Sequence, residues 1–143
     1  MQNLRFTEPD DDATLEDWRH VHNAIIPADP LSLDDVRERV TRHHLEVAYL
    51  GDVLVGCTTV RPPKEGTATV IARVLPAHRR QGFGERLYAR GLDRARSLGA
   101  EAVETIVLGI NPEGLEFAHR HGFVEVDRYV AGVDEVWHTL RLM

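Results

Sequence analysis

Residues 74–87 read Val-Leu-Pro-Ala-His-Arg-Arg-Gln-Gly-Phe-Gly-Glu-Arg-Leu, and this stretch joins the end of an apolar run to the start of a predicted helix. The first N–H groups of a helix have no partner within it, and the helix dipole adds partial positive charge at that end. Gly82 and Gly84 lack side chains, so a ligand can approach the backbone closely. Arg79 and Arg80 add fixed positive charge and forked donors. The stretch therefore predicts a binding site for a phosphorylated ligand.

The composition is that of an ordinary globular protein. The 143 residues, 43% hydrophobic and 28% charged, fit a single domain over residues 1–143. A formal net charge of −6 argues against general nucleic-acid binding, so the adjacent arginines stand out against an acidic background. The apolar runs are too short to span a bilayer, the N-terminus lacks the apolar core of a signal peptide, and one cysteine fits a reducing compartment. We therefore expect a cytoplasmic protein without nucleic-acid or membrane partners.

The glycine-containing stretch resembles a known cofactor loop. Arg79-x-x-Gly82-x-Gly84, preceded by a predicted strand ending in Val74-x-Pro76, is similar to the acetyl-coenzyme A loop of the GNAT N-acetyltransferase superfamily. In isolation this short motif is equally typical of a solvated turn that begins a helix. A second motif downstream favours the cofactor loop, because it is similar to the family pattern Asn-x-x-Ala-x-x-Leu-Tyr-x-x-x-Gly-Phe. That motif reads Asn111-x-x-Gly114-x-x-Phe117-Ala118-x-x-x-Gly122-Phe123.

The resemblance implies a set of residues that bind acetyl-CoA or another acyl-CoA. Backbone N–H groups of residues 81–85 would bind the pyrophosphate, and backbone groups at the strand end would pair with the pantetheine arm. Phe83 is expected to pack beneath the loop. Asn111 would bond to the cofactor, cap the following helix, or do both. The implied cofactor-binding residues are Val74, Leu75, Arg79, Arg80, Gln81, Gly82, Phe83, Gly84, Glu85 and Asn111.

Apolar periodicity and turn residues predict an α+β fold in the order β-α-α-β-β-β-α-β-α-β-β. The predicted helices cover residues 13–25, 33–43, 84–97 and 111–122, and the predicted strands cover residues 3–7, 45–50, 53–61, 67–75, 102–110, 123–131 and 133–142. The largely apolar strand 102–110 is expected to be buried on both faces. The resemblance implies four helices around a mixed, mostly antiparallel sheet that splays between strands 67–75 and 102–110, with the cofactor in the V between them.

Acetyl transfer to an amine needs a neutral nucleophile and a proton for the leaving thiolate. In many members of the family a tyrosine of the second motif supplies that proton, but the matching residue here is Ala118. Strand 67–75 also lacks an acidic residue that would act as a base. Water is one alternative route for the proton. The candidate side chains are Glu104, Tyr129 and His119, followed by Tyr49, Tyr88 and His121.

Other reactive residue types receive structural interpretations. Arg73 would bind a substrate carboxylate or, as we slightly favour, form a salt bridge with Glu104 across the splayed sheet. Cys57 is expected to be a core thiol rather than a nucleophile. No metal site is predicted, since the histidine pairs are adjacent or two residues apart and do not share a helix face.

The sequence thus predicts an acetyl-CoA-dependent N-acetyltransferase that transfers its acyl group directly to a small-molecule or peptide amine. The acceptor is expected between the first two predicted helices, hairpin 45–61 and the last two strands. Ala118 keeps an alternative open, a non-catalytic acyl-CoA-binding module that serves as a sensor or assembly partner. Transfer to a hydroxyl or thiol is a third possibility. A homodimer is also predicted, because the edge formed by the last strands would need covering.

Overall fold

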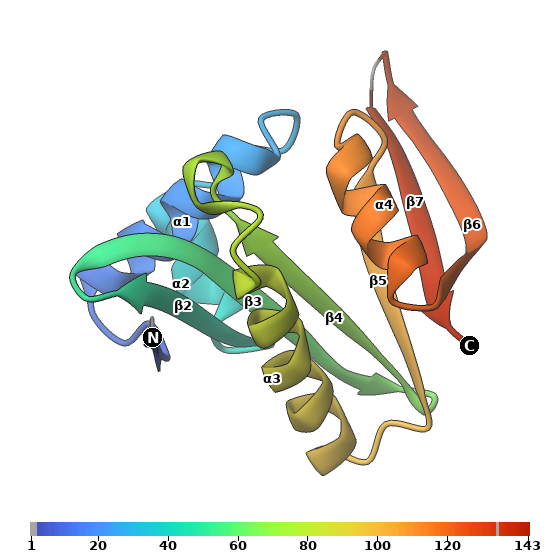
Figure 1. The fold of residues 1–143 in the computed structure, drawn as a ribbon, viewed down its shortest axis with the longest axis horizontal. Coiled ribbons are helices and arrows are strands. Elements are labelled where there is room, and N and C mark those ends of the chain that lie inside the picture. The colour runs from blue at the N-terminus through green and yellow to red at the C-terminus, as the bar shows by residue number, and fades with distance from the viewer. Residues whose placement is uncertain (1–2, 134) are drawn as a thin grey trace.

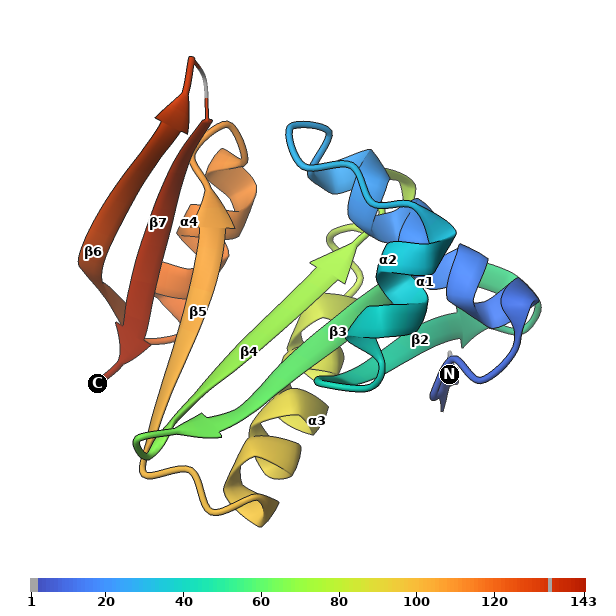
Figure 2. The same ribbon diagram turned by 180° about the vertical axis from the view of Figure 1, so that it is seen from behind.

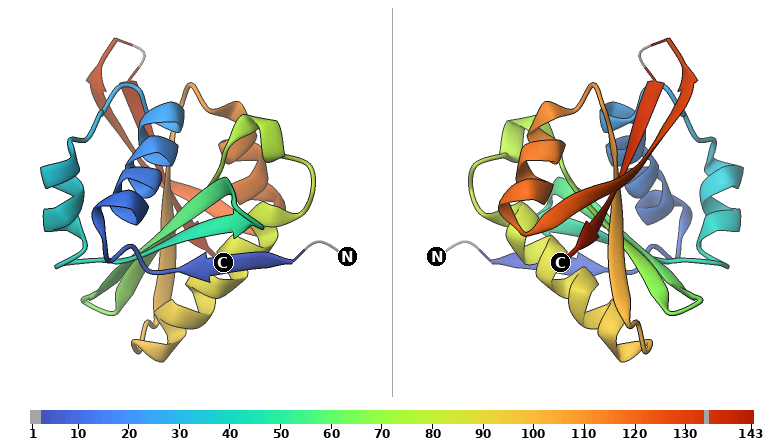
Figure 3. Two further views of the ribbon diagram at one scale, coloured as in Figure 1. Left: turned by 90° about the vertical axis from the view of Figure 1, so that its left-hand side faces the viewer. Right: turned by 90° about the vertical axis from the view of Figure 1, so that its right-hand side faces the viewer.

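The computed structural model describes residues 3–133 and 135–143. Residues 1–2 of the predicted domain and residue 134 of the predicted strand 133–142 lie outside the described residues. Seven strands form one sheet in the order β1-β2-β3-β4-β5-β7-β6, antiparallel except for the parallel pair β4 and β5. Helices α1 and α2 cover one face, and α3 and α4 cover the other (Figure 3). The predicted fold class and element order are confirmed. The elements are β1 (Leu4–Thr7), α1 (Asp12–Ile25), α2 (Leu33–Arg39), β2 (His44–Leu50), β3 (Val53–Lys64), β4 (Thr67–Val74), α3 (Phe83–Ser97), β5 (Ala102–Leu108), α4 (Pro112–Arg120), β6 (Phe123–Gly132) and β7 (Glu135–Leu142).

Two sequence-based boundaries were wrong. Helix α2 ends at Arg39 rather than near residue 43, because Thr41 N–H bonds back only three residues to Glu38 and β2 already begins at His44. Strand β3 continues through Pro62-Pro63 to Lys64. Both prolines fall where its register with β4 is irregular, and there a missing N–H costs no ladder bond.

Strand β5 is not buried on both faces, which corrects the sequence-based expectation. Val103, Thr105 and Val107 are buried, whereas the alternate residues Glu104 and Ile106 are only partly buried. The reason is that α4 covers one face of β5, while α1 and α2 lie over the other half of the sheet (Figure 2). This opens the second face of β5 toward solvent.

The sheet divides into two arms between β4 and β5. These strands pair only at Thr67↔Ala102, Ala68↔Val103 and Thr69↔Glu104, and beyond those pairs they diverge into a V (Figure 1). The predicted splay is therefore confirmed. Because β3 and β7 pair with the outer edges, the inner edges of the V carry backbone groups without a strand partner.

Separate hydrophobic clusters fix the position of the helices. Trp18 of α1 is fully buried in the cluster on the α1 and α2 face, and its indole N–H donates to the carbonyl of Thr58, 3.2 Å away. On the opposite face α3 packs closely on β4, since a Cβ added to Gly91 would lie 2.5 Å from Cγ1 of Val70. The absence of a side chain at residue 91 thus sets how near α3 approaches the V.

Strand β6 forms the outer edge of the sheet, and every residue of it after Phe123 is exposed. Val124, Val126, Tyr129 and Val130 are at least half exposed. This is the edge at which the sequence predicts pairing with a second copy, and the homodimer stays a prediction. Among the described residues, no helix has the length and apolarity needed to cross a membrane.

Gly91→Ala should destabilise the protein, although Gly→Ala at an exposed helix position stabilises by about 1 kcal/mol. The added methyl group would overlap Val70, a stiff β-branched residue, and should lower the free energy of unfolding by about 1–3 kcal/mol. Urea denaturation measures the change. Gly84→Ala in the same helix is the matched control, since its Cβ meets nothing nearer than 3.4 Å. A Gly91→Ala variant more stable than the wild type would contradict the close packing of α3 on β4.

Candidate active site

A cleft of about 730 Å³ occupies the V between β4 and β5. On the α3 and α4 face its walls include Tyr88 and Phe117, and on the other face they include Ile25 and Ile26 at the end of α1. The cleft therefore passes through the sheet from one face to the other. Two substrates can enter it from opposite sides and meet within it.

The start of α3 forms a cradle of unpaired N–H groups at one end of this cleft. Gly82 caps the helix with φ +79°, and no atom would lie within 4 Å of a Cβ placed there. Arg80 also has a positive φ, +65°, a strained backbone conformation for a residue with a side chain. Within residues 3–133 and 135–143, the N–H groups of residues 80–85 meet no protein acceptor. Successive free amides at a helix N-terminus are suited to an anion such as a diphosphate.

The two adjacent arginines, Arg79 and Arg80, have different roles in the structure, although the sequence analysis assigned both to the ligand. Arg79 links two elements of the protein: its Nε donates to the carbonyl of Val74 at 3.0 Å, and its Nη1 lies 2.9 Å from Oε2 of Glu113. It thereby ties the end of β4 to the start of α4. Arg80 is exposed and, among the described residues, makes no ion pair. Arg80 is thus the one free to bind an anion.

The backbone groups of β4 that face the cleft belong to Val74 and Ala72, whereas the sequence predicted Val74 and Leu75. Leu75 N–H donates to Val55 O at 2.9 Å, so this predicted ligand-binding amide already bonds to β3. Because backbone groups of an antiparallel strand alternate between its two edges, those of Val74 and Ala72 face the V. The Val74 carbonyl accepts from Arg79, which leaves the Val74 N–H and both groups of Ala72. Sequence analysis missed Ala72, because the residues of β4 that face the V are known only once the register of β4 with β3 is known.

Asn111 and Phe83 both take structural roles, as the sequence allowed. The Asn111 side-chain oxygen accepts from Gly114 N–H at 3.1 Å, so the residue caps α4 while also lining the cleft. Phe83 is only 2% exposed and packs beneath the loop. The remaining predicted cofactor residues, apart from Gln81 and Leu75, are also among those that line the cleft.

Comparison with known proteins gives this arrangement a family. Residues 5–123 match the model of the family described as "Acetyltransferase (GNAT) family". The chain belongs to this GNAT family. A mycothiol acetyltransferase from Stackebrandtia nassauensis is 34% identical over 80 residues, which cover 56% of this chain and 26% of that protein. The chain thus matches only about a quarter of the length of that curated relative.

Solved GNAT structures share the whole fold. The structure of Ard1 from Thermoplasma volcanium superposes with a TM-score of 0.81 at 16% identity, and the alignment covers 96% of this chain and 95% of that chain. The structure of yncA from Salmonella typhimurium with its cofactor acetyl-CoA gives a TM-score of 0.73 at 18% identity, covering 98% and 93%. At these identities the likeness establishes the fold alone.

Three of the candidate proton-transfer residues, Glu104, Tyr129 and His119, are not among the described residues that line the cleft. Glu104 is bound by Arg141, with Nη2 2.8 Å from Oε2, so the predicted Arg73–Glu104 salt bridge was wrong. The two side chains lie on strands that have already diverged at Arg73, which explains why they do not meet. Tyr129 is 65% exposed on β6, and His119 is exposed on α4. Their catalytic roles stay predictions.

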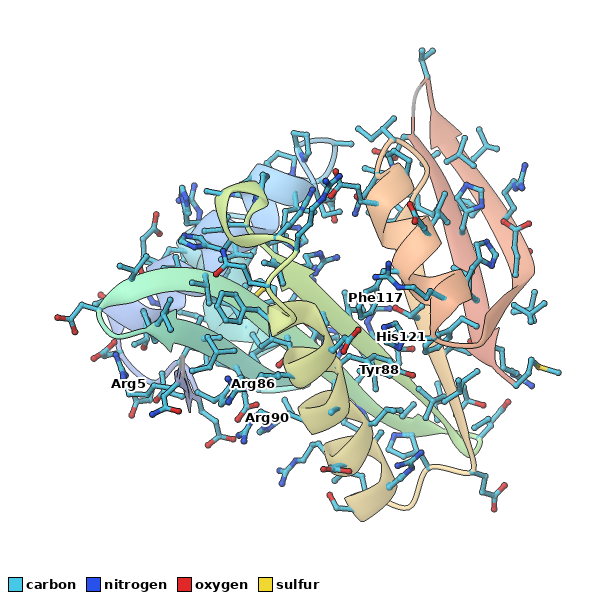
Figure 4. All side chains as sticks on the ribbon, viewed as in Figure 1. Arg5, Arg86, Tyr88, Arg90, Phe117 and His121 are labelled. Atoms are coloured by element: carbon cyan, nitrogen blue, oxygen red, sulfur yellow. The ribbon has the colours of Figure 1, made fainter. Side chains whose placement is uncertain are left out.

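Tyr88 is the candidate that the structure brings into the cleft. Its ring packs against Phe117, Phe123 and His121, with centroids 6.0, 5.5 and 5.6 Å away (Figure 4). The hydroxyl is buried and has no hydrogen-bond partner within the described part of the chain. Burial raises the pKa of Tyr88 to about 12, so the phenol keeps its proton at neutral pH. Ala118, also buried, belongs to the same cluster.

The other reactive groups are accounted for. Tyr49 donates to Asp17 at 2.6 Å, and burial together with this bond raises its pKa. Cys57 is fully buried, and burial raises the pKa of its thiol to about 12, which confirms the core interpretation. Among the described residues there is no group of three His, Cys, Asp or Glu side chains that would hold a metal ion.

Gly82→Glu should abolish acetyl-CoA binding, because the new carboxylate would enter the open cradle and repel a diphosphate. We expect at least a hundredfold weaker binding by calorimetry. Gly99→Glu is the matched control, since Gly99 also has a positive φ (+87°) and no atom within 4 Å of its Cβ position. Both variants should lose about 1–2 kcal/mol of stability through backbone strain. Equal affinity in folded Gly82→Glu and Gly99→Glu proteins would refute the cradle.

Proposed function

We propose that this GNAT-family protein is an acetyl-CoA-dependent N-acetyltransferase that transfers an acetyl group directly to an amine in a ternary complex. The observation that carries the proposal is the continuous cleft, which begins at the amide cradle and ends on the α1 face. Acetyl-CoA, when bound, supplies an activated thioester. The residues present fit this cofactor, because the cradle suits its pyrophosphate and the free β4 edge suits the amides of its pantetheine arm.

In this proposal each residue has a defined task. Arg80 and the N–H groups of residues 81–85 hold the diphosphate, and Val74 and Ala72 align the extended arm along β4. The acceptor enters from the α1 face, beside Ile25 and Ile26. As the acceptor nitrogen forms a bond to the acetyl carbon and the carbon–sulfur bond breaks, the nitrogen loses a proton and the sulfur gains one. Tyr88 is our candidate for that donor, because the residue lines the cleft and its protonated hydroxyl has no hydrogen-bond partner among the described residues.

Ala118 and the lack of an acidic residue on β4 favour one alternative, a module that binds acyl-CoA without catalysis. The two functions share the cradle and differ only in turnover. Transfer to a hydroxyl or thiol would use the same cleft and differs only in the acceptor. We also propose a cytoplasmic location and a homodimer in which the exposed edge of β6 is covered by a second copy.

Calorimetry with acetyl-CoA, followed by free-thiol release against a library of amines, alcohols and thiols, tests the proposed function. We expect saturable acetyl-CoA binding and thiol release that depends on an amine. Binding without acceptor-dependent release would favour the non-catalytic module, and release only with alcohols or thiols would reassign the acceptor. If neither acetyl-CoA nor CoA binds at high micromolar concentration, the function is wrong.

Tyr88→Phe tests the proton donor. This variant keeps the ring packing against Phe117 and Phe123 and removes only the hydroxyl, so acetyl-CoA affinity should not change. Turnover should fall about a hundredfold, the usual range for loss of a general acid. Tyr129→Phe, at an exposed position on β6, is the control and should leave turnover unchanged. Wild-type turnover in Tyr88→Phe would assign the proton to water or another group.

A further inference from the structure

We propose that the acceptor amine carries a neighbouring carboxylate and that Arg73 binds it. This inference rests on the proposed N-acetyltransferase function and names the acceptor as an amino acid or a close analogue. It is carried by an arginine that lies in the cleft without a carboxylate partner from the protein.

Arg73 lies on the face of the sheet that α1 and α2 cover, opposite the face on which α3 packs. It is opposite Cys57 in the β3–β4 register, so both side chains are on the same face of the sheet. Cys57 belongs to the cluster formed by α1 and α2, whereas Val70 on the other face contacts α3. Arg73 also lines the cleft together with Ile25 and Ile26. Its guanidinium is therefore on the face from which the acceptor would enter.

Three arginines around the sheet have a carboxylate partner, whereas Arg73, like Arg61 on β3, has none among the described residues. Arg79 pairs with Glu113, Arg90 with Glu46 and Arg141 with Glu104, each at 2.7–2.9 Å. Within residues 3–133 and 135–143, no carboxylate lies at salt-bridge distance from Arg73. A partly buried charge without a counter-charge costs stability. A ligand carboxylate would supply the missing partner, and guanidinium geometry suits it through two parallel hydrogen bonds.

The charges around Arg73 are mainly positive. Burial is the largest cause that lowers the pKa of Arg73, and the charges of Arg39 and Arg61 lower it further, while Cys57 and Asp29 oppose them. The neighbouring His22 adds no further positive charge, since burial lowers its pKa to about 4 and it is neutral at pH 7. This local field opposes the overall charge of −6 and disfavours polycationic acceptors.

The position of Arg73 on β4 favours a carboxylate close to the amine. Arg73 is adjacent in sequence to Val74 and Ala72, whose backbone groups face the V where the cofactor arm would lie. In this proposal the carboxylate binds Arg73 while the amine of the same molecule faces the thioester. An α-amino acid, which carries both groups on one carbon, is the acceptor class that we infer.

Matched substrate pairs test the inference directly. The twenty standard L-amino acids and their carboxamides have nearly the same shape and differ in the negative charge. With wild-type protein and acetyl-CoA, we expect kcat/KM for the best amino acid to exceed that of its carboxamide by at least thirtyfold. Arg73→Met should erase this preference, and Arg73→Lys, which keeps the charge but loses the fork, should retain part of it. Acetyl-CoA affinity should be unchanged in both variants.

Two controls separate ligand binding from a structural role. Arg90→Met removes an arginine that pairs with Glu46 outside the cleft, and it should leave the preference intact. Arg73→Met should keep or raise Tm by a few degrees, because it removes an unpaired charge. A fall in Tm larger than that of Arg90→Met would show that Arg73 is structural and overturn the inference.

The possible failures are distinguishable. Equal rates with amino acids and carboxamides would overturn the carboxylate inference and leave the N-acetyltransferase function standing. If acetyl-CoA binds but no acceptor reacts, the proposed function fails instead. Calorimetry of the amino acids and carboxamides with CoA-loaded protein then decides the role of Arg73, since equal affinities in wild type and Arg73→Met would refute it.

Discussion

The divergence of β4 from β5 after three residue pairs is the constraint on which the rest of the structure depends. A parallel pair that continued would satisfy both inner edges and leave no cleft. Because it stops, each arm must be stabilised separately, and α3 with α4 covers one face while α1 with α2 covers part of the other. The cradle at the start of α3, the free edge of β4 and the guanidinium of Arg73 then border one space. The site therefore exists because the hydrogen bonds between β4 and β5 stop after the first three residue pairs.

Charge is distributed so that the cleft differs from the surface around it. The acidic chain uses many of its carboxylates to hold arginines in place, as Glu113 holds Arg79 and Glu104 holds Arg141. Arg80 at the cradle and Arg73 on the α1 and α2 face lack such partners among the described residues. Arg80 also keeps a strained backbone conformation, which persists only where the surrounding structure requires it. Two arginines that line the cleft thus have positive charge available for a ligand, whereas Arg79 serves to join the two arms.

The fold and the position of the glycine-containing loop at the start of α3 were readable from the sequence, whereas the side chains that border the cleft beside it were not. Local signals suffice for the elements, because Asp11, Ser32 and Asn111 cap the helices that they precede. Arg73 was assigned to Glu104 because both residues are charged and lie on neighbouring strands, but pairing also depends on how far those strands have separated. Leu75 was expected to offer backbone groups to the ligand, but its N–H faces β3. Which residues of β4 face β3 depends on the register between the two strands, and the sequence does not state that register. Tyr88 is one of several tyrosines by sequence, and only the packing of α3 on α4 brings it into the cleft.

The brief contact between β4 and β5 also bears on how the molecule holds together without a ligand. Residues 102–133 and 135–142 form one arm, and its contacts with the rest of the chain include three strand pairs, the Arg79–Glu113 and Glu85–His121 ion pairs and the cluster around Tyr88. Such an arm is suited to open as a cooperative unit below the cost of global unfolding. A molecule lying along the V would bond to both arms and act as a removable strand of the sheet. Its concentration would then set the conformational stability of the protein through linkage, in addition to its role in the reaction.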